Sequence, residues 1–237
     1  MKKSIALIGG VGTQSGFSLA LINKLLEHEY YVVGVARSGL GKEALTESFS
    51  DNPYVEFIWG DLQDTHFLKS LVSRFEANAM SITIYIHNAA RLVLKPFLDT
   101  TVDDFEDSWE VTVKTAVTVS KALIPSMLAS QRGVLIFTGA TASIKGNANA
   151  SPFAAAKFGL RALSQSLARE FGPQGIHVAH VIADGVIAGN RAQETFNLSE
   201  ASCIQPDALA DLYLDVICQD KSCWSQEIDA RPYLEKF

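Results

Sequence analysis

Hydrophobic residues occur along this chain in two patterns: short continuous runs, and longer segments in which they recur every three or four positions. Continuous runs are typical of strands that a parallel sheet buries on both faces, and the wider spacing is typical of amphipathic helices. The runs predict strands at residues 5–8, 30–37, 55–61, 81–90, 133–140, 176–185 and 227–231. The periodic segments predict helices at residues 16–28, 64–77, 103–129, 152–171 and 206–219.

Strands and helices alternate from one end of this pattern to the other. Such an order predicts an α/β fold, namely a doubly wound parallel sheet of the Rossmann type. No internal repeat, low-complexity tract or linker interrupts the alternation, so we expect residues 1–237 to form a single domain.

The composition excludes several classes of function. Hydrophobic residues make up 48% of the 237, which is enough for a sizeable core. The net charge of −6, without any long basic run, argues against nucleic-acid binding. No apolar segment has the length that a bilayer requires, and the three cysteines lack the spacing of a zinc site. We therefore expect a soluble, cytoplasmic protein without a metal site.

The turn between the first strand and the first helix is rich in glycine. It reads Gly10-Val11-Gly12-Thr13-Gln14-Ser15-Gly16-Phe17-Ser18. Glycine allows the backbone to approach a pyrophosphate closely, and the following helix offers free N–H groups at its N-terminus. An ordinary tight turn would also use glycine, but the position after the first strand favours a nucleotide site. The predicted contacts are Gly10, Gly12, Thr13, Gly16 and Phe17.

The end of the second strand indicates which nucleotide would bind. NAD-binding domains place an acidic residue there for the ribose 2′-hydroxyl, whereas an arginine accommodates a 2′-phosphate. This strand ends in Ala36-Arg37-Ser38, and the next acidic residue is Glu43. Arg37 could instead be an ordinary surface residue. Its location favours NADP(H) over NAD(H), with Arg37 and Ser38 at the 2′-phosphate.

With these features placed, the chain resembles the short-chain dehydrogenase/reductase family over almost its whole length. Asp61-Leu62 matches the pair that contacts adenine in that family, and His87-Asn88-Ala89-Ala90 is similar to its Asn-Asn-Ala-Gly motif beside the ribose. Asp184-Gly185 stands where the family has Pro-Gly next to the nicotinamide carboxamide. The resemblance implies a nicotinamide cofactor and the following contacts: Asp61, Leu62, Asn88, Ala89, Ala90, Lys157, Asp184, Gly185 and Ile187.

The chain departs from the family at the catalytic residues. Family members use a tyrosine as proton donor, a lysine one helical turn later, a serine that binds the substrate oxygen, and an asparagine that anchors a relay water. Here Lys157 is present, but Phe153 takes the tyrosine position, Ala140 the serine position and Thr112 the asparagine position. These changes together remove the tyrosine mechanism.

Another group would have to donate the proton to the substrate. No tyrosine lies between Tyr85 and Tyr213, and Tyr85 belongs to a predicted core strand. Thr141, beside the vacated serine position, could hydrogen-bond a carbonyl or simply complete a turn. Further polar candidates are Thr138, Ser143, Ser151, His180 and Asp184. We expect Lys157 to hold the ribose hydroxyls and Phe153 to line the pocket; the predicted catalytic site is Lys157, Thr112, Thr141 and Phe153.

Two functions fit this sequence. The first is an NADP(H)-dependent oxidoreductase with a non-standard proton donor, acting on a small carbonyl or conjugated-alkene substrate. The second is a catalytically inactive NADP(H)-binding protein with a regulatory or sensing role. We favour the enzyme. The family resemblance also implies a homodimer or homotetramer and a substrate lid at about 188–205.

Overall fold

The computed structural model describes residues 3–12, 16–37, 42–189 and 196–234. Its strands form one seven-stranded sheet in the order β3-β2-β1-β4-β5-β6-β7, and every neighbouring pair is parallel. The strands are β1 (Lys3–Gly9), β2 (Tyr31–Ala36), β3 (Val55–Trp59), β4 (Met80–His87), β5 (Gly133–Thr138), β6 (Ile176–Ala183) and β7 (Glu227–Ala230). The predicted fold class, a doubly wound Rossmann-like sheet, is confirmed.

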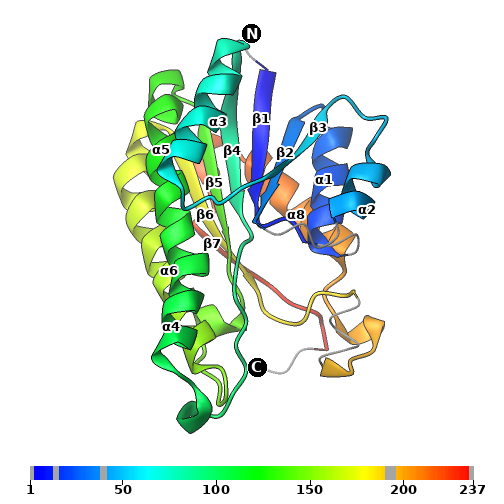
Figure 1. Ribbon diagram of the computed structural model, residues 1–237, viewed down its shortest axis with the longest axis vertical. Helices are drawn as coiled ribbons and strands as arrows, with labels where there is room; N and C mark the ends of the chain where they lie inside the picture. The colour runs from blue at the N-terminus through cyan, green and yellow to red at the C-terminus, as the bar shows by residue number, and fades with distance from the viewer. Residues whose placement is uncertain (1–2, 13–15, 38–41, 190–195, 235–237) are drawn as a thin grey trace.

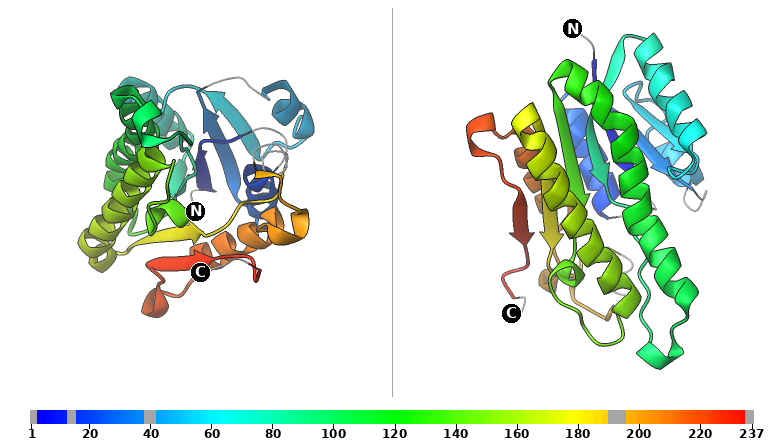
Figure 2. Two further views of the ribbon diagram at one scale, coloured as in Figure 1. Left: turned by 90° about the horizontal axis from the view of Figure 1, so that it is seen from below. Right: turned by 90° about the vertical axis from the view of Figure 1, so that its left-hand side faces the viewer.

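Helices cover both faces of the sheet (Figures 1 and 2). The α-helices are α1 (Phe17–Glu27), α2 (Lys42–Ser48), α3 (Thr65–Ala77), α4 (Val102–Trp109), α5 (Thr115–Ser130), α6 (Ser151–Phe171) and α8 (Pro206–Cys218). Helices α3, α5 and α6 lie on one face, and α1 and α8 lie on the other. The short α2 was not predicted from the sequence. No helix of the described residues has the length and apolar character needed to cross a membrane.

Each face of the sheet has its own hydrophobic core because successive strand residues point to opposite sides. Ile5 and Leu7 of β1 pack in the core beneath α3, α5 and α6, whereas Ala6 and Ile8 pack beneath α1 and α8. All four residues are fully buried. Burial on both faces explains why the strands appear in the sequence as continuous hydrophobic runs.

Several strands end earlier than the sequence predicted. Strands β3, β4, β5 and β6 stop two or three residues before the predicted ends. The ladder of backbone hydrogen bonds ends at the carboxyl edge of the sheet, where the chain turns away. Asp61, Asn88, Ala140 and Asp184 therefore lie just beyond their strands, at the edge where ligands bind in such sheets.

The predicted continuous helix over 103–129 is wrong, because a π-helical turn at Glu110–Lys114 separates α4 from α5. The backbone N–H of Thr115 donates to the carbonyl of Glu110, five residues earlier. The carbonyl of Thr112 accepts a hydrogen bond from the buried imidazole of His87, at 2.8 Å. A side chain from β4 thus stabilises the irregular turn. Single π-turns of this kind are frequent at functional sites.

The predicted lid begins in a segment that is anchored to the rest of the fold. Ile187 and Ile204 form a parallel bridge, the N–H of Ala188 donates to the carbonyl of Ile204 at 2.8 Å, and the N–H of Ile204 donates to Val186 at 2.9 Å. Residues 190–195 of the predicted lid lie outside the described residues.

Candidate functional site

A cavity of about 390 Å³ lies at the carboxyl ends of β1, β2 and β4. The chain continues from β1 to one side of the sheet and later from β4 to the other, so this is the topological switch point at which open α/β sheets bind ligands. Predicted cofactor residues that line the cavity are Gly10, Gly12, Arg37, Asp61, Leu62, Asn88, Ala89 and Ala90.

The glycine turn presents bare backbone to this cavity. Gly10 has φ +89°, and a Cβ atom there would lie 2.5 Å from the backbone of Ala89, so the position requires glycine. A Cβ atom on Gly12 would meet no atom of the described residues within 4 Å. The space in front of Gly12 fits the close approach of a pyrophosphate. Thr13 lies outside the described residues.

Ser18 stands where the family's glycine motif ends, and its hydroxyl connects the turn to β4. It accepts hydrogen bonds from the N–H of Gly12 at 3.4 Å and from the side-chain amide of Asn88 at 3.3 Å. The same amide lies 3.4 Å from the carbonyl of Gly10, and the N–H of Asn88 donates to Gly9 at 2.8 Å. Asn88 is therefore fixed beside the turn, and its contact with the ribose stays a prediction. The role of Ser18 was missed.

The N-terminus of α1 contributes backbone rather than side chains. Gly16 has φ +103°, a conformation that favours glycine. The ring of Phe17 is buried and packs against Tyr213, with centroids 4.7 Å apart. Phe17 can therefore offer a ligand its N–H group, while its side chain belongs to the core.

Arg37 and Asp61 lie at the far end of the cavity, on the side of β2 and β3. Arg37 is exposed and also lines a neighbouring cavity of about 490 Å³. Asp61 is exposed, and its carboxylate accepts the N–H of Gln63 at 2.9 Å, whereas Leu62 is buried. A guanidinium at the rim is suited to a phosphate group. Ser38 lies outside the described residues.

Lys157 lies on α6 with 3% of its surface exposed. Its Nζ atom donates to the carbonyl of Thr138 at 2.7 Å and lies 5.6 Å from the centroid of the Phe153 ring. Burial lowers the pKa of Lys157 to about 8. The lysine thus points at the carboxyl end of β5. The phenyl ring occupies the adjacent helical turn, as the sequence predicted, and the contact of Lys157 with the ribose stays a prediction.

A buried chain of hydrogen bonds lies beneath the site. Tyr85 donates from its hydroxyl to Nδ1 of His87 at 2.7 Å, and Nε2 of His87 lies 2.8 Å from the carbonyl of Thr112. Because a carbonyl can only accept, Nε2 carries the proton and Nδ1 accepts from Tyr85. Burial, assisted by Lys157, lowers the pKa of His87 to about 3. Burial also raises the pKa of Tyr85. Neither group is therefore a suitable proton donor near neutral pH.

Thr112 takes part in this series of buried hydrogen bonds through its backbone carbonyl. The side chain is fully buried, and its hydroxyl oxygen has no hydrogen-bond partner among the described residues. His87 engages the carbonyl of Thr112 and not its side chain. The predicted catalytic role of the Thr112 side chain stays a prediction.

Thr141, Asp184 and Arg231 form a second polar chain at the same edge of the sheet. Thr141 donates from its hydroxyl to Oδ1 of Asp184 at 2.6 Å, and Nη2 of Arg231 lies 3.0 Å from Oδ2. Arg231 also pairs with Asp229. Gly185 follows with φ +148°. The sequence singled out Thr141 and Asp184 separately, whereas their contact and the partner Arg231 were missed.

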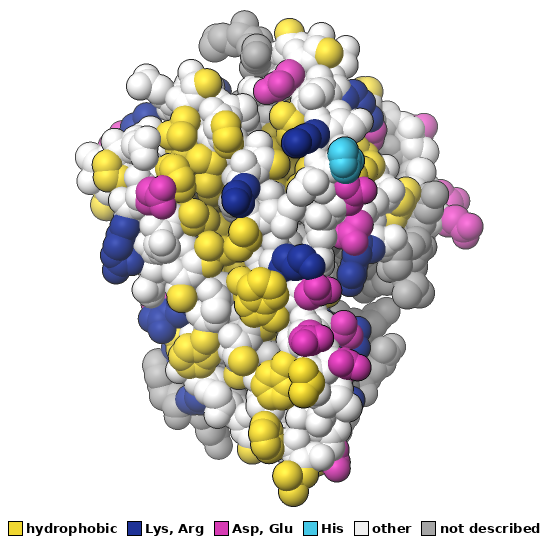
Figure 3. All heavy atoms as spheres, turned by 60° about the vertical axis from the view of Figure 1, so that its left-hand side comes forward, with side chains coloured by type: hydrophobic (Ala, Val, Ile, Leu, Met, Phe, Trp, Pro, Cys, Tyr) yellow, Lys and Arg dark blue, Asp and Glu magenta, His cyan; other side chains and the backbone are white. Residues whose placement is uncertain are grey.

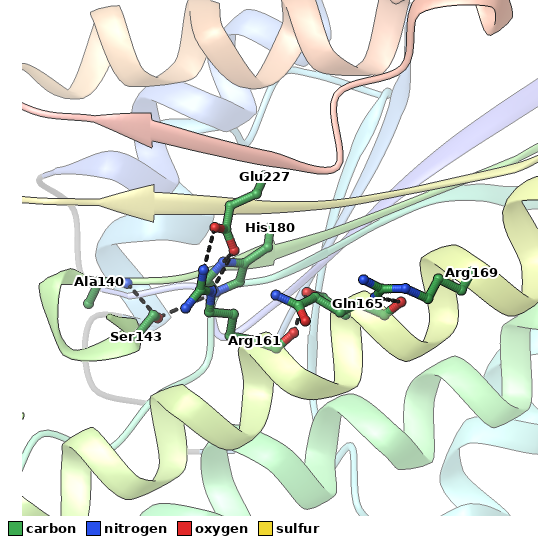
Figure 4. Close-up of polar contacts among 8 residues, drawn as sticks. Ala140, Ser143, Arg161, Gln165, Arg169, His180 and Glu227 are labelled. Carbon is green, nitrogen blue, oxygen red and sulfur yellow. Dashed lines mark hydrogen bonds and ion pairs between the residues drawn. The ribbon is translucent and has the colours of Figure 1, made fainter. Parts of the chain in front are cut away.

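Ser143, His180 and Glu227 form a cluster at β5, β6 and β7 in which Ser143 and His180 are buried and Glu227 is partly exposed (Figure 4). The Ser143 hydroxyl accepts the N–H of Ala140 at 3.1 Å and lies 3.4 Å from Nε2 of His180. Glu227 lies 3.6 Å from Nδ1 of His180 and is held by two hydrogen bonds from Arg161, at 2.6 and 2.7 Å.

The order serine, histidine, carboxylate resembles a hydrolytic triad, but Ser143 and His180 are fully buried. Burial lowers the pKa of His180 to about 4, so the imidazole is neutral near pH 7. A buried, neutral imidazole is a poor proton donor near pH 7. Among the described residues no group of three or more His, Cys, Asp and Glu could hold a metal ion.

Comparisons with known proteins agree with this geometry. A family model described as short chain dehydrogenase matches residues 4–198. The 3-oxoacyl-[acyl-carrier-protein] reductase FabG of Escherichia coli is 27% identical over 183 residues, which cover 77% of this chain and 73% of that protein.

Two solved structures have the same fold. A short-chain dehydrogenase from Rhodopseudomonas palustris is 27% identical with a TM-score of 0.79, and the match covers 97% of this chain and 99% of that one. A metagenomic short-chain oxidoreductase in complex with NADP has a TM-score of 0.80 at 22% identity, with 99% of each chain covered.

Proposed function

The chain belongs to the short-chain dehydrogenase family, and from this premise we propose that it is an NADP(H)-dependent oxidoreductase whose proton donor is not a tyrosine. Its substrate would be a small carbonyl compound, the corresponding alcohol, or a conjugated alkene. The observation that carries the proposal is the open glycine cradle of Gly10 and Gly12, which lies at the switch point of the sheet with Arg37 at its rim.

In this proposal each part of the cofactor has a partner among the described residues. Gly10 and Gly12 would face the pyrophosphate, Arg37 the 2′-phosphate, and Asp61 with Leu62 the adenine. The ribose next to the nicotinamide would contact the Asn88–Ala90 segment and Lys157, and the carboxamide would lie beside Asp184, Gly185 and Ile187. When bound, such a cofactor gives or accepts a hydride.

The transfer of the proton then depends on the chain's own residues. Phe153 has no proton to donate, so it serves as an apolar wall beside Lys157. A general acid contributes about 10²–10⁴-fold to a rate, so hydride transfer can proceed slowly without the tyrosine. Substrates whose reduction needs little assistance from an acid suit this site best.

The relatives support the same assignment. The Escherichia coli relative is named as a reductase of 3-oxoacyl groups carried on a protein, and a structure with the same fold holds NADP. A 3-oxoacyl or 3-hydroxyacyl thioester is therefore a natural probe for this chain.

The replaced residues favour a second candidate function. Phe153, Ala140 and Thr112 together remove the groups that would serve a substrate oxygen, while the cofactor cradle is intact. A regulatory protein that binds NADP(H) without turnover would need only the cradle.

The surface supports self-association. Hydrophobic side chains gather on the face formed by α4, α5 and α6 (Figure 3). Val102, Trp109 and Phe158 are 73%, 48% and 42% exposed there. A second copy of the chain packed on this face would bury them, which supports the homodimer or homotetramer that the resemblance implied.

Two measurements test the proposed function. Fluorescence titration should give tighter binding of NADPH than of NADH; equal affinities, or no binding, would contradict the assignment to NADP(H). Stopped-flow mixing of the NADPH complex with ketones, enones and enoyl or 3-oxoacyl thioesters should oxidise the cofactor. NADPH binding without oxidation over that panel would support the regulatory alternative.

A further inference from the structure

The polar chain of Thr141, Asp184 and Arg231 spans the carboxyl ends of three neighbouring strands, β5, β6 and β7. Thr141 is partly exposed, whereas Asp184 is buried, with 6% of its surface exposed. Thr141 is thus more accessible than the carboxylate that accepts its hydrogen. A hydroxyl, a proton acceptor and a group that orients the acceptor is the general arrangement of catalytic triads.

We propose that Thr141 and Asp184 together accept the proton of a substrate hydroxyl, in the place of the missing phenol. Thr141 is the catalytic residue because it would contact the substrate oxygen. Asp184 and Arg231 are positioning residues, since they act through Thr141. The inference rests on the proposed function, because the proton leaves the same substrate that loses a hydride.

The orientation of the existing hydrogen bond determines the direction of transfer. The Thr141 hydrogen is donated to Oδ1 of Asp184 at 2.6 Å, which leaves the lone pairs of the threonine oxygen free to accept. A substrate O–H can therefore donate to Thr141, whereas a substrate carbonyl would have to compete with Asp184 for the same hydrogen. The arrangement favours a secondary alcohol as substrate.

The step balances as the oxidation of an alcohol to a ketone. The carbinol C–H bond breaks with its electron pair, which leaves as hydride to the oxidised nicotinamide cofactor. The substrate O–H bond breaks, its electron pair becomes the second bond of the carbonyl, and its proton passes to the oxygen of Thr141. The original hydroxyl proton of Thr141 passes to Oδ1 of Asp184, which later releases it to water.

Several other polar groups of the described residues near the site are already committed. Lys157 donates to the carbonyl of Thr138, and the imidazole of His87 is engaged at both nitrogens. Ser143 is fully buried and accepts the N–H of Ala140. Among the polar candidates named from the sequence, Thr141 is the hydroxyl that combines partial exposure of the residue with a hydrogen bond to a carboxylate.

The test compares Thr141→Val and Asp184→Asn with two matched controls. Thr141→Ser keeps the hydroxyl, and Asp229→Asn removes the other carboxylate that pairs with Arg231 without touching Thr141. The first readout is turnover of NADP⁺ with cyclohexanol, 1-phenylethanol and 3-hydroxybutyryl-N-acetylcysteamine. The second needs no turnover: ¹⁹F NMR titration of the NADP⁺ complex with trifluoroethanol, an alcohol that resists oxidation. Melting temperature and NADPH affinity confirm that each variant folds.

We expect kcat to fall about 100-fold in Thr141→Val and in Asp184→Asn, and to stay within about twofold in Asp229→Asn. Thr141→Ser, which keeps the hydroxyl, should be more active than Thr141→Val. The solvent isotope effect of the wild type should depend on deuterium content with the curvature of two moving protons, and Asp184→Asn should lose that curvature. Trifluoroethanol should bind about tenfold more weakly to Thr141→Val than to the wild type.

Wild-type rates and trifluoroethanol affinities in both variants would overturn the inference and leave the proposed function intact. Absence of turnover in the wild type would instead contradict the proposed function. In that case the trifluoroethanol titration still tests the inference. Equal affinities of the wild type and Thr141→Val for trifluoroethanol would show that Thr141 does not contact the alcohol.

Discussion

The ammonium group of Lys157 lies over the ring of Phe153, 5.6 Å from its centroid, and this ring carries no hydroxyl at the position that the family gives to a tyrosine. The Phe153→Tyr variant would place a proton donor next to this cation, which lowers the pKa of a neighbouring phenol. We expect reduction of ordinary ketones by NADPH to rise at least about tenfold, since a general acid contributes about 10²–10⁴-fold. Steady-state assays with cyclohexanone and acetoacetyl thioesters measure the effect.

The control is Phe158→Tyr, which adds the same hydroxyl to an exposed ring on the same helix. Equal rates in the wild type, Phe153→Tyr and Phe158→Tyr would mean that the ring of Phe153 does not border the reacting carbon.

The titration of Lys157 should make the free energy of unfolding change with pH in the alkaline range. Burial lowers its pKa from 10.5 to about 8, so between these values the unfolded chain binds the extra proton, and the free energy of unfolding rises with pH. Below pH 8 the buried charge costs about 3 kcal/mol, at about 1.4 kcal/mol for each pKa unit. Lys157→Met should therefore be more stable than the wild type at pH 7, by up to this amount, and should bind NADPH more weakly.

Urea unfolding at pH 7 and pH 10.5, with NADPH titration, checks both effects. The stability gain should shrink at the higher pH. A variant that is less stable at pH 7 would indicate that the Thr138 contact outweighs the cost of burying the charge.

The sequence predicted the elements that form the glycine turn and the end of β4 because their signals are local. A glycine at φ +89° after a buried strand, and an asparagine at the end of β4, can each be recognised within a few residues. The roles of Ser18, His87 and Arg231 were missed because they depend on partners far away in the sequence. Ser18 meets Asn88 70 residues later, and His87 meets Thr112 25 residues later.

The π-helical turn was missed for the same physical reason. Its residues have the hydrophobic spacing of an ordinary helix, and the break is associated with the hydrogen bond from His87 to the carbonyl of Thr112. Periodicity reports which face of a helix is buried, but it carries no information on which side chain of another element competes for a carbonyl.

His87 should make the protein sensitive to acid. Burial and Lys157 lower its pKa from 6.5 to about 3, so the unfolded chain binds an additional proton within this range. The free energy of unfolding should therefore fall as the pH decreases from about 6.5 towards 3. His87→Gln removes the titrating group and should reduce the slope of stability against pH by about one proton.

Urea unfolding at several pH values between 4 and 7 measures this slope. His180, whose pKa burial lowers to about 4, should still contribute in the variant, so the slope should decrease without disappearing. An unchanged slope in His87→Gln would show that His87 is protonated to the same extent in the folded and unfolded chains.

Arg37 should determine the preference between the two nicotinamide dinucleotides. Arg37→Ala should bind NADPH at least about tenfold more weakly, because hydrogen bonds between charged groups contribute about 1.5–3 kcal/mol, and it should leave NADH affinity unchanged. Arg74→Ala is the matched control, since Arg74 is also partly exposed but pairs with Glu56 on the outer side of β3 and α3. Parallel loss of both cofactors in Arg37→Ala would contradict a contact with the 2′-phosphate.

Substitutions at Gly10 and Gly12 should have different effects, although the two residues lie two positions apart. The first should lower stability and the second should weaken cofactor binding. A methyl group on Gly10 would lie 2.5 Å from the backbone of Ala89 and would require φ +89°, so Gly10→Ala should lower the free energy of unfolding by about 1–3 kcal/mol or more. A methyl group on Gly12 would meet no described atom within 4 Å, so Gly12→Ala should unfold within about 1 kcal/mol of the wild type. The same methyl group would occupy the space left for a pyrophosphate, and NADPH affinity should fall at least about tenfold. Urea unfolding without cofactor and fluorescence titration with NADPH measure the two effects separately. If Gly12→Ala bound NADPH as tightly as the wild type, the turn would not approach the pyrophosphate, and the cavity at the carboxyl ends of β1 and β4 would have to serve a different ligand.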